Sequence, residues 1–101
     1  MNAKAMDARS FLERAKMLLS QRGKTYDGSN DERSMARIVA IYNAIYCEKM
    51  TEAQGWGFML CLKIARLVAA PEFHQDSAED LCAYSALLSE CMADNAADNP
   101  Q

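Results

Sequence analysis

Six polar residues on either side of a short loop could together bind a phosphate group. They are Lys63 and Arg66 before the loop, His74 within it, and Asp76, Asp80 and Tyr84 after it. Cations attract phosphate, and the first turn of a helix adds a positive dipole and unpaired N–H groups. The carboxylates would then orient the cations. We therefore take these residues as candidate ligand-binding residues.

The same residues also fit a purely structural role. In an antiparallel hairpin with a loop over residues 70–76, Arg66 and Asp80 lie equally far from the loop. At 1.5 Å per residue, each would sit about 6 Å along its helix. They could form a partly buried ion pair, with Tyr84 bonded beside it, that fixes the register of the two helices. The sequence leaves both interpretations open.

Helices must position these residues, because glycine and proline are scarce and good helix formers are frequent. Apolar residues recur with helical spacing in four segments. We predict an all-α four-helix bundle with helices at about 7–21, 31–47, 52–69 and 77–93, the last two forming a central hairpin. Residues 1–93 would form a single domain, and residues 94–101 a frayed tail. Arg14 is assigned to the outer face of the first helix, and Asp76 or Ser77 to the cap of the fourth.

The second and third helices carry more specific predictions. The apolar stripe of the second is Met35, Ile38, Val39, Tyr42, Ile45 and Tyr46, and Asn43 among its alanines is expected to satisfy a hydrogen bond. Thr51 and Gln54 form a capping box at the start of the third. Gly55 and Gly57 then indicate close backbone packing or room for another group. Because the third helix is apolar on every side apart from two cations, we expect it to be central and partly buried in a homodimer.

The loop at residues 23–30, GKTYDGSN, contributes two more candidate ligand contacts. Tyr26 is either an anchor that holds the loop to the bundle or a ligand-lining residue. Lys24 stands in a Gly-Lys-Thr sequence like the end of a phosphate-binding P-loop. Since the first glycine of that motif and the strand before it are missing, we reject a P-loop.

Composition narrows the classes of function. A net charge of −3 and a pI near 5.0 argue against a nucleic-acid binder. The N-terminus has no apolar signal-peptide segment, and the apolar run at 55–70 is too short and too charged to span a bilayer. The four cysteines, Cys47, Cys61, Cys82 and Cys91, are expected to be reduced core thiols of a cytoplasmic protein. One histidine and no nucleophile motif leave a classical hydrolase unsupported.

Five blocks of sequence carry a resemblance to a known family. They are RGKTYD at 22–27, ERSM at 32–35, TEAQGW at 51–56, LKIAR at 62–66, and H-x-D-S-x-x-D-x-x-x-Y at 74–84. This pattern, over about residues 11–92, is similar to a family of small, uncharacterised phage and prophage helical proteins. The resemblance implies a bacterial-virus context without an established activity. It marks as positions of interest Lys63, Arg66, His74, Asp76, Asp80 and Tyr84.

More remotely, the hairpin with its acidic second helix resembles the MazG-type all-α nucleotide pyrophosphohydrolases. Those hold Mg²⁺ with E-E-x-x-E on one helix and E-x-x-D on the next. Glu79 and Asp80 lie in the region of the second element, but Lys63 and Arg66 stand where the first would be. Two cations would repel Mg²⁺, which needs carboxylate oxygens. We therefore expect no metal ligands among the candidate residues and no cofactor, with Mg²⁺ as the alternative.

Two functions are compatible with these residues. The first is a small phage-type accessory protein that binds, or processes, a phosphorylated, nucleotide-like ligand at the polar cluster. The alternative is a non-enzymatic interaction protein that inhibits or redirects a host protein such as a defence enzyme. The expected partners are accordingly a phosphate-containing small molecule or a host protein, with no nucleic acid and no membrane. Whether the chain is an enzyme is left open.

Overall fold

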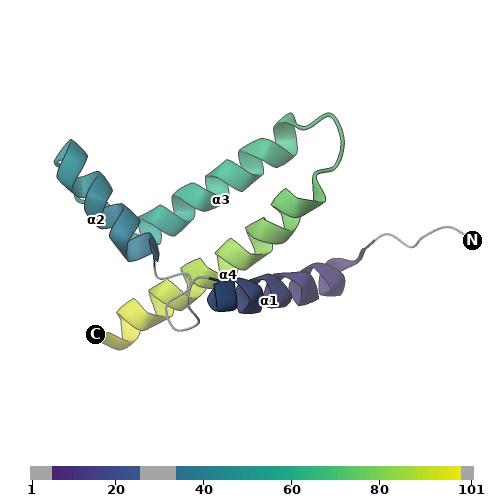
Figure 1. Ribbon diagram of the computed structural model, residues 1–101, viewed down its shortest axis with the longest axis horizontal. Coiled ribbons are helices and arrows are strands. Elements are labelled where there is room, and N and C mark those ends of the chain that lie inside the picture. The colour runs from purple at the N-terminus through teal and green to yellow at the C-terminus, as the bar shows by residue number, and fades with distance from the viewer. Residues whose placement is uncertain (1–5, 26–33, 99–101) are drawn as a thin grey trace, which may run out of the picture.

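The computed structural model describes residues 6–25 and 34–98, and the secondary structure in these ranges is entirely helical (Figure 1). The helices are α1 (Ala8–Thr25), α2 (Ser34–Tyr46), α3 (Glu52–Ala69) and α4 (Gln75–Asp98). The predicted all-α fold is confirmed, and the predicted bounds of α3 are correct. The predicted start of α2 falls outside the described residues.

The last helix is longer than predicted. α4 begins at Gln75 and continues to Asp98, so the first part of the predicted frayed tail is helical. Alanine is frequent there, and neither glycine nor proline interrupts the chain before Pro100. A segment with these residues can extend a helix that is already nucleated.

α3 and α4 are the two inner helices of the bundle. α1 packs against the outer side of α4, and α2 packs against α3 at the edge (Figure 1). The buried residues of α4 include Ser77, Ala83 and Leu87. The predicted central hairpin is therefore confirmed, but α3 is not covered on every side, and Val68 on its outer side is 80% exposed. Among the described helices, only α2 and α4 cover α3.

One apolar cluster joins α2 to α3 and α4. Its buried members are Met35, Val39, Trp56 and Leu87. The approach of α2 to α3 depends on Gly55, where a Cβ would lie 2.5 Å from Met35 Sδ and 3.0 Å from Val39 Cγ2. A Cβ at Gly57 would meet nothing within 4 Å. Close backbone packing is thus confirmed at Gly55, while Gly57 faces open space.

The apolar stripe predicted for α2 divides into two sides. Met35 and Val39 are buried against α3, but the other four members of the stripe are exposed: Ile38, Tyr42, Ile45 and Tyr46. An apolar stripe usually faces the core, but only two of its six members do so here. α2 has a described helix packed against only one of its sides, so its remaining apolar side chains point away from the bundle.

Local hydrogen bonds hold the turn between α2 and α3. Cys47 adopts a left-handed conformation with φ of 53°, and the Glu48 N–H donates to the Asn43 carbonyl oxygen at 3.2 Å. This is the pattern of a Schellman helix end. The Asn43 side chain donates to the Met50 carbonyl at 2.9 Å and accepts from the Met50 N–H at 2.8 Å, as expected for a satisfied polar residue.

The capping box at the start of α3 is confirmed. The Gln54 N–H donates to Thr51 Oγ1 at 3.1 Å, and the Thr51 N–H donates to Gln54 Oε1 at 2.9 Å. These two bonds satisfy N–H groups that the first turn of a helix cannot satisfy internally. They fix where α3 begins after the turn.

The cysteines are free thiols, but the prediction that they lie in the core is wrong. Cys47 and Cys61 are exposed, and Cys82 and Cys91 are half-buried. Burial, together with nearby carboxylates, raises the pKa of the Cys91 thiol. Among the described helices, none combines the length and apolar character needed to cross a membrane.

Candidate functional site

Lys63 forms an ion pair with Asp80 between α3 and α4. The Lys63 Nζ lies 3.0 Å from Asp80 Oδ2, and the two side chains are only 10% and 16% exposed. The predicted partner, Arg66, is exposed instead. Equal height in the hairpin was an insufficient criterion, because it ignores rotation about the helix axis. Lys63 follows Trp56 by seven residues and shares its buried side, whereas Arg66 does not.

Tyr84 completes this buried cluster. The Lys63 Nζ lies 5.9 Å from the centre of the Tyr84 ring, within the range of a cation–π contact. The Tyr84 ring lies 5.8 Å from the Trp56 ring, centre to centre. The Lys63 ammonium therefore contacts a carboxylate and an aromatic face in a nearly closed space. In this position it stabilises the α3–α4 contact and presents little charge to a ligand.

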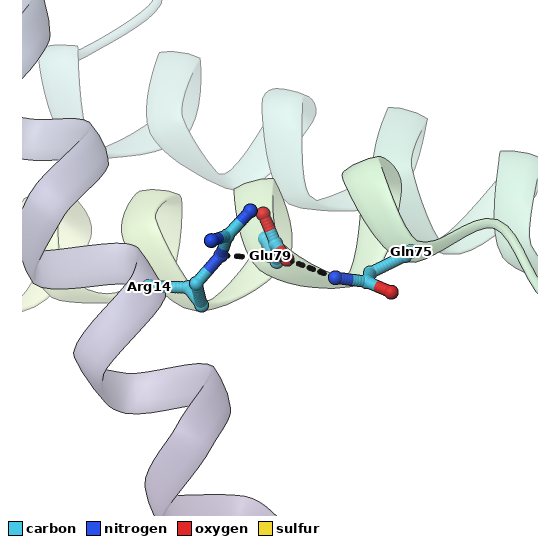
Figure 2. A network of polar contacts seen from close by, with 3 residues as sticks. All are labelled: Arg14, Gln75 and Glu79. Atoms are coloured by element: carbon cyan, nitrogen blue, oxygen red, sulfur yellow. Dashed lines mark hydrogen bonds and ion pairs between the residues drawn. The ribbon is translucent and has the colours of Figure 1, made fainter. Parts of the chain in front are cut away.

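Glu79 forms a second buried polar contact, toward α1. Figure 2 shows Arg14 reaching from α1 to Glu79, with Gln75 on the other side of the carboxylate. Arg14 Nε donates to Glu79 Oε2 at 3.2 Å, and Gln75 Nε2 donates to the same oxygen at 2.7 Å. The Glu79 side chain is 5% exposed, against 53% for Arg14.

Sequence reasoning missed this contact by assigning Arg14 to the outer face of α1. The adjacent carboxylates Glu79 and Asp80, which cannot both face α3, were the available signal. Successive residues on an α-helix point about 100° apart. Glu79 and Asp80 can therefore bind different neighbours, and they tie α1 and α3 to different sides of α4.

His74 is the N-terminal cap of α4. The Ser77 N–H donates to His74 Nδ1 at 3.2 Å, and the buried Ser77 hydroxyl lies 2.6 Å from the same nitrogen. Since Nδ1 accepts a backbone N–H, the proton of the neutral ring resides on Nε2. The predicted caps, Asp76 and Ser77, are wrong because the helix begins before them, at Gln75. Asp76 lies exposed in the first turn, where its charge suits the helix dipole.

Arg66 and His74 line one shallow pocket at the loop end of the hairpin. Ala69 and Ala70 complete its lining, and its volume is about 400 Å³. The six hairpin candidates thus fall into separate places rather than one cleft. Lys63, Asp80 and Tyr84 lie between the helices, whereas Arg66 and His74 lie at the loop and Asp76 lies on the surface of α4.

Two candidates come from the loop after α1. Lys24 lies in the last turn of α1, but its side chain is outside the described part of the structure, and Tyr26 lies outside the described residues altogether. Within residues 6–25 and 34–98, no group of three or more histidine, cysteine, aspartate or glutamate side chains could hold a metal ion.

A family of unknown function matches most of this chain. The match, to a domain described as "Domain of unknown function (DUF6378)", spans residues 10–92 and so includes all four helices in part or whole. The chain belongs to the DUF6378 family. The matched range is close to residues 11–92, over which the sequence predicted a family resemblance. No curated protein and no solved structure matches the chain significantly.

The DUF6378 fold also presents a large exposed apolar surface. We call this the outer α2 surface, and it consists of Ile38, Ile41, Tyr42, Ile45, Tyr46 and Phe58. These side chains are between 37% and 64% exposed. Beside them, Tyr42 and Phe58 line a pocket of about 510 Å³ whose other walls include Glu48 and Lys49. Sequence reasoning missed this surface because an apolar stripe does not show whether a neighbouring helix covers it.

Proposed function

We propose that this DUF6378 protein is a non-enzymatic interaction protein that binds a protein partner through the outer α2 surface. A single observation carries the proposal: six large apolar side chains gather on one side of α2 and the start of α3 and remain more than one-third exposed. At about 200 Å² per fully exposed side chain, they present on the order of 650 Å². The largest apolar patch on a typical monomer covers about 300–600 Å² and is often functional.

The polar residues of the hairpin support this choice over catalysis. Lys63 is held by Asp80, and Glu79 is held by Arg14 and Gln75. A ligand would have to replace Asp80 beside Lys63 in a nearly closed space, at the cost of a buried ion pair. Buried polar contacts of this kind fix the arrangement of helices without taking part in a reaction.

The resemblance to phage and prophage proteins suggests the setting of such an interaction. In that setting, the protein would act in the host cytoplasm and would inhibit or redirect a host protein, for example a defence enzyme. An accessory protein of this kind needs a binding surface and no reactive pocket, which agrees with the position of the exposed apolar residues on α2.

Photo-crosslinking in cells tests the proposal directly. A benzophenone amino acid at position 42, within the outer α2 surface, should yield covalent adducts with a protein that mass spectrometry can identify. The matched control carries the same group at position 17 on α1, where Met17 is 52% exposed, more than the 37% of Tyr42. Equal adducts from both positions, or none from position 42, would refute the proposal.

A second candidate function is the binding of a phosphorylated, nucleotide-like ligand at the Arg66–His74 pocket. The observation that favours it is that both side chains line one pocket beside the start of α4. Because His74 Nδ1 caps the helix, Arg66 and the His74 Nε2–H would donate to the phosphate. Nucleotides and inorganic phosphate should then raise the melting temperature of the wild type, with and without Mg²⁺, but not that of Arg66→Gln. Absence of stabilisation by any phosphate compound at millimolar concentration would exclude this function.

A further inference from the structure

We infer that the partner at the outer α2 surface is a second copy of this chain, bound by antiparallel pairing of the two α2 helices. The inference rests on the proposed function, because it names the partner of the same surface. The sequence analysis expected α3 to be partly buried in a homodimer. The inference places the homodimer contact mainly on α2 instead. In the structure, α3 contributes Phe58 to this surface, and α2 contributes the rest.

The exposed area is sufficient for a dimer. A standard protein–protein interface buries about 800 Å² on each partner. The six side chains supply on the order of 650 Å² of this, using about 200 Å² for each one when fully exposed. A two-fold axis uses the same patch on both subunits, so no second apolar surface is needed.

The spacing of the exposed residues suits the pairing of two helices. Ile38, Ile41, Tyr42, Ile45 and Tyr46 follow the i, i+3, i+4, i+7, i+8 pattern of a helix-packing seam. The seam is centred between Ile41 and Tyr42. A two-fold axis at that point places Ile38 opposite Ile45 of the partner subunit, and Ile41 opposite Tyr42 of the partner subunit.

Charge selects the antiparallel arrangement over the parallel one. Arg37 is the only charged residue of α2. A parallel pair would place the two Arg37 side chains at the same height and would align the two helix dipoles, and both effects are unfavourable. An antiparallel pair separates the two Arg37 residues by about 14 Å along the axis. It also brings each Arg37 to the negative end of the partner subunit's α2, near the exposed Glu48 that follows it.

The molecular mass of the full chain in solution is the first test. Sedimentation equilibrium should show a mass twice that of one chain for the wild type, and Ile41→Lys should halve it. Leu12→Lys is the matched control, since Leu12 is 64% exposed on α1, away from the seam, and should leave the mass doubled. A mass that stays doubled in Ile41→Lys would overturn the inference.

Cysteine cross-linking in a Cys47→Ser/Cys61→Ser background, which removes both exposed thiols, tests the arrangement, and it does not require Ile41→Lys to fold. Ile41→Cys alone should cross-link upon oxidation, because position 41 lies next to the axis. Ile38→Cys and Ile45→Cys should not cross-link separately but should do so when mixed. Cross-linking of each one separately would show a parallel pair and overturn the inference.

The two levels of proposal can fail separately. A monomeric wild type whose photo-crosslinks from position 42 join a different protein would overturn the second copy as partner and leave the proposed function standing. Adducts from position 42 that join two copies of the chain support the second copy as partner and overturn a host protein as the partner of this surface. A monomer without adducts from position 42 overturns both.

Discussion

Replacing Lys63 by methionine should destabilise the protein more than replacing Arg14 by methionine, although each change removes one cation from an ion pair. The Lys63–Asp80 pair has an N–O distance of 3.0 Å and side chains that are 10% and 16% exposed. Lys63→Met leaves the buried Asp80 charge without this cation. Breaking a buried pair in this way costs about 3–5 kcal/mol. That is a large fraction of the roughly 5–15 kcal/mol that holds a native domain together.

Arg14 provides the control because its environment differs while the chemical change is the same. Its side chain is 53% exposed, and solvent screens the interaction with Glu79. The Glu79 side chain is only 5% exposed, so Arg14→Met also removes a partner from a buried carboxylate. In Arg14→Met, however, Glu79 keeps the hydrogen bond from Gln75 at 2.7 Å. We therefore expect Arg14→Met to lower the free energy of unfolding by about 1–3 kcal/mol, the cost of removing one partner from a buried polar group.

Urea denaturation followed by circular dichroism at 222 nm measures these differences. All variants should be compared at one protein concentration, because self-association adds to the apparent stability. The double variant Lys63→Met/Asp80→Leu should regain most of the stability lost in Lys63→Met, since two well-packed apolar side chains can replace a buried pair. The coupling energy between the two sites should reach about 2 kcal/mol or more.

Two results would refute this reasoning. One is a cost for Lys63→Met no greater than that for Arg14→Met. The other is a double variant no more stable than Lys63→Met alone. Either result would mean that the Lys63–Asp80 contact contributes little to the fold, and Lys63 would again be a candidate for binding a phosphorylated ligand.

Four further predictions concern single positions. Gly57→Ala should raise the free energy of unfolding by about 0.5–1 kcal/mol, because alanine favours a helix over glycine and a Cβ at this position meets no other atom. Gly55→Ala should lower the free energy of unfolding, because its Cβ would overlap side chains of α2. Urea denaturation of the two variants measures both changes. Cys47→Gly should stabilise the protein by about 1 kcal/mol, because the left-handed backbone at this position strains a residue with a Cβ. A lower melting temperature of the variant would contradict this. His74→Ala should cost about 0.5–2 kcal/mol and His74→Asp should restore the loss, since the cap needs only a hydrogen-bond acceptor; equal stability of both variants in urea would argue against the capping role. Hydrogen bonds from the Ser10 N–H and hydroxyl lower the pKa of Asp7 below its ordinary value of 3.8. The stabilisation of the α1 N-terminus by Asp7 is therefore present above pH 3.8 and is lost as the pH falls through the lowered pKa. Amide exchange in the first turn of α1 should show this pH dependence, and Asp7→Asn should abolish it.

Local features of the fold could be predicted from the sequence because they depend on neighbours within one turn. The capping box of Thr51 and Gln54, the bounds of α3 and the satisfied side chain of Asn43 are of this kind. Gly55 also indicated close packing correctly. The same pattern at Gly57 did not, because a glycine marks a possible approach without showing whether another helix is there.

Contacts between helices were predicted less well, because the sequence does not show how each helix is rotated about its own axis. The sequence placed Lys63, Arg66 and Asp80 at neighbouring heights of one hairpin, which indicated a polar cluster with an ion pair. It assigned the pair to Arg66, although the side of α3 that faces α4 carries Lys63. Arg14 was missed for the same reason, since nothing local shows that one edge of α1 reaches Glu79.

The sequence by itself determined that this chain forms helices, where α3 begins and ends, and that charged residues of both signs meet in the α3–α4 hairpin. Only the tertiary structure decided that α1 packs against α4 and α2 against α3, that Lys63 rather than Arg66 binds Asp80, and that most of the apolar residues of α2 are exposed. A helical repeat of apolar residues shows which side chains share a side of a helix. Which neighbour covers that side, and whether any does, depends on contacts between residues far apart in the chain.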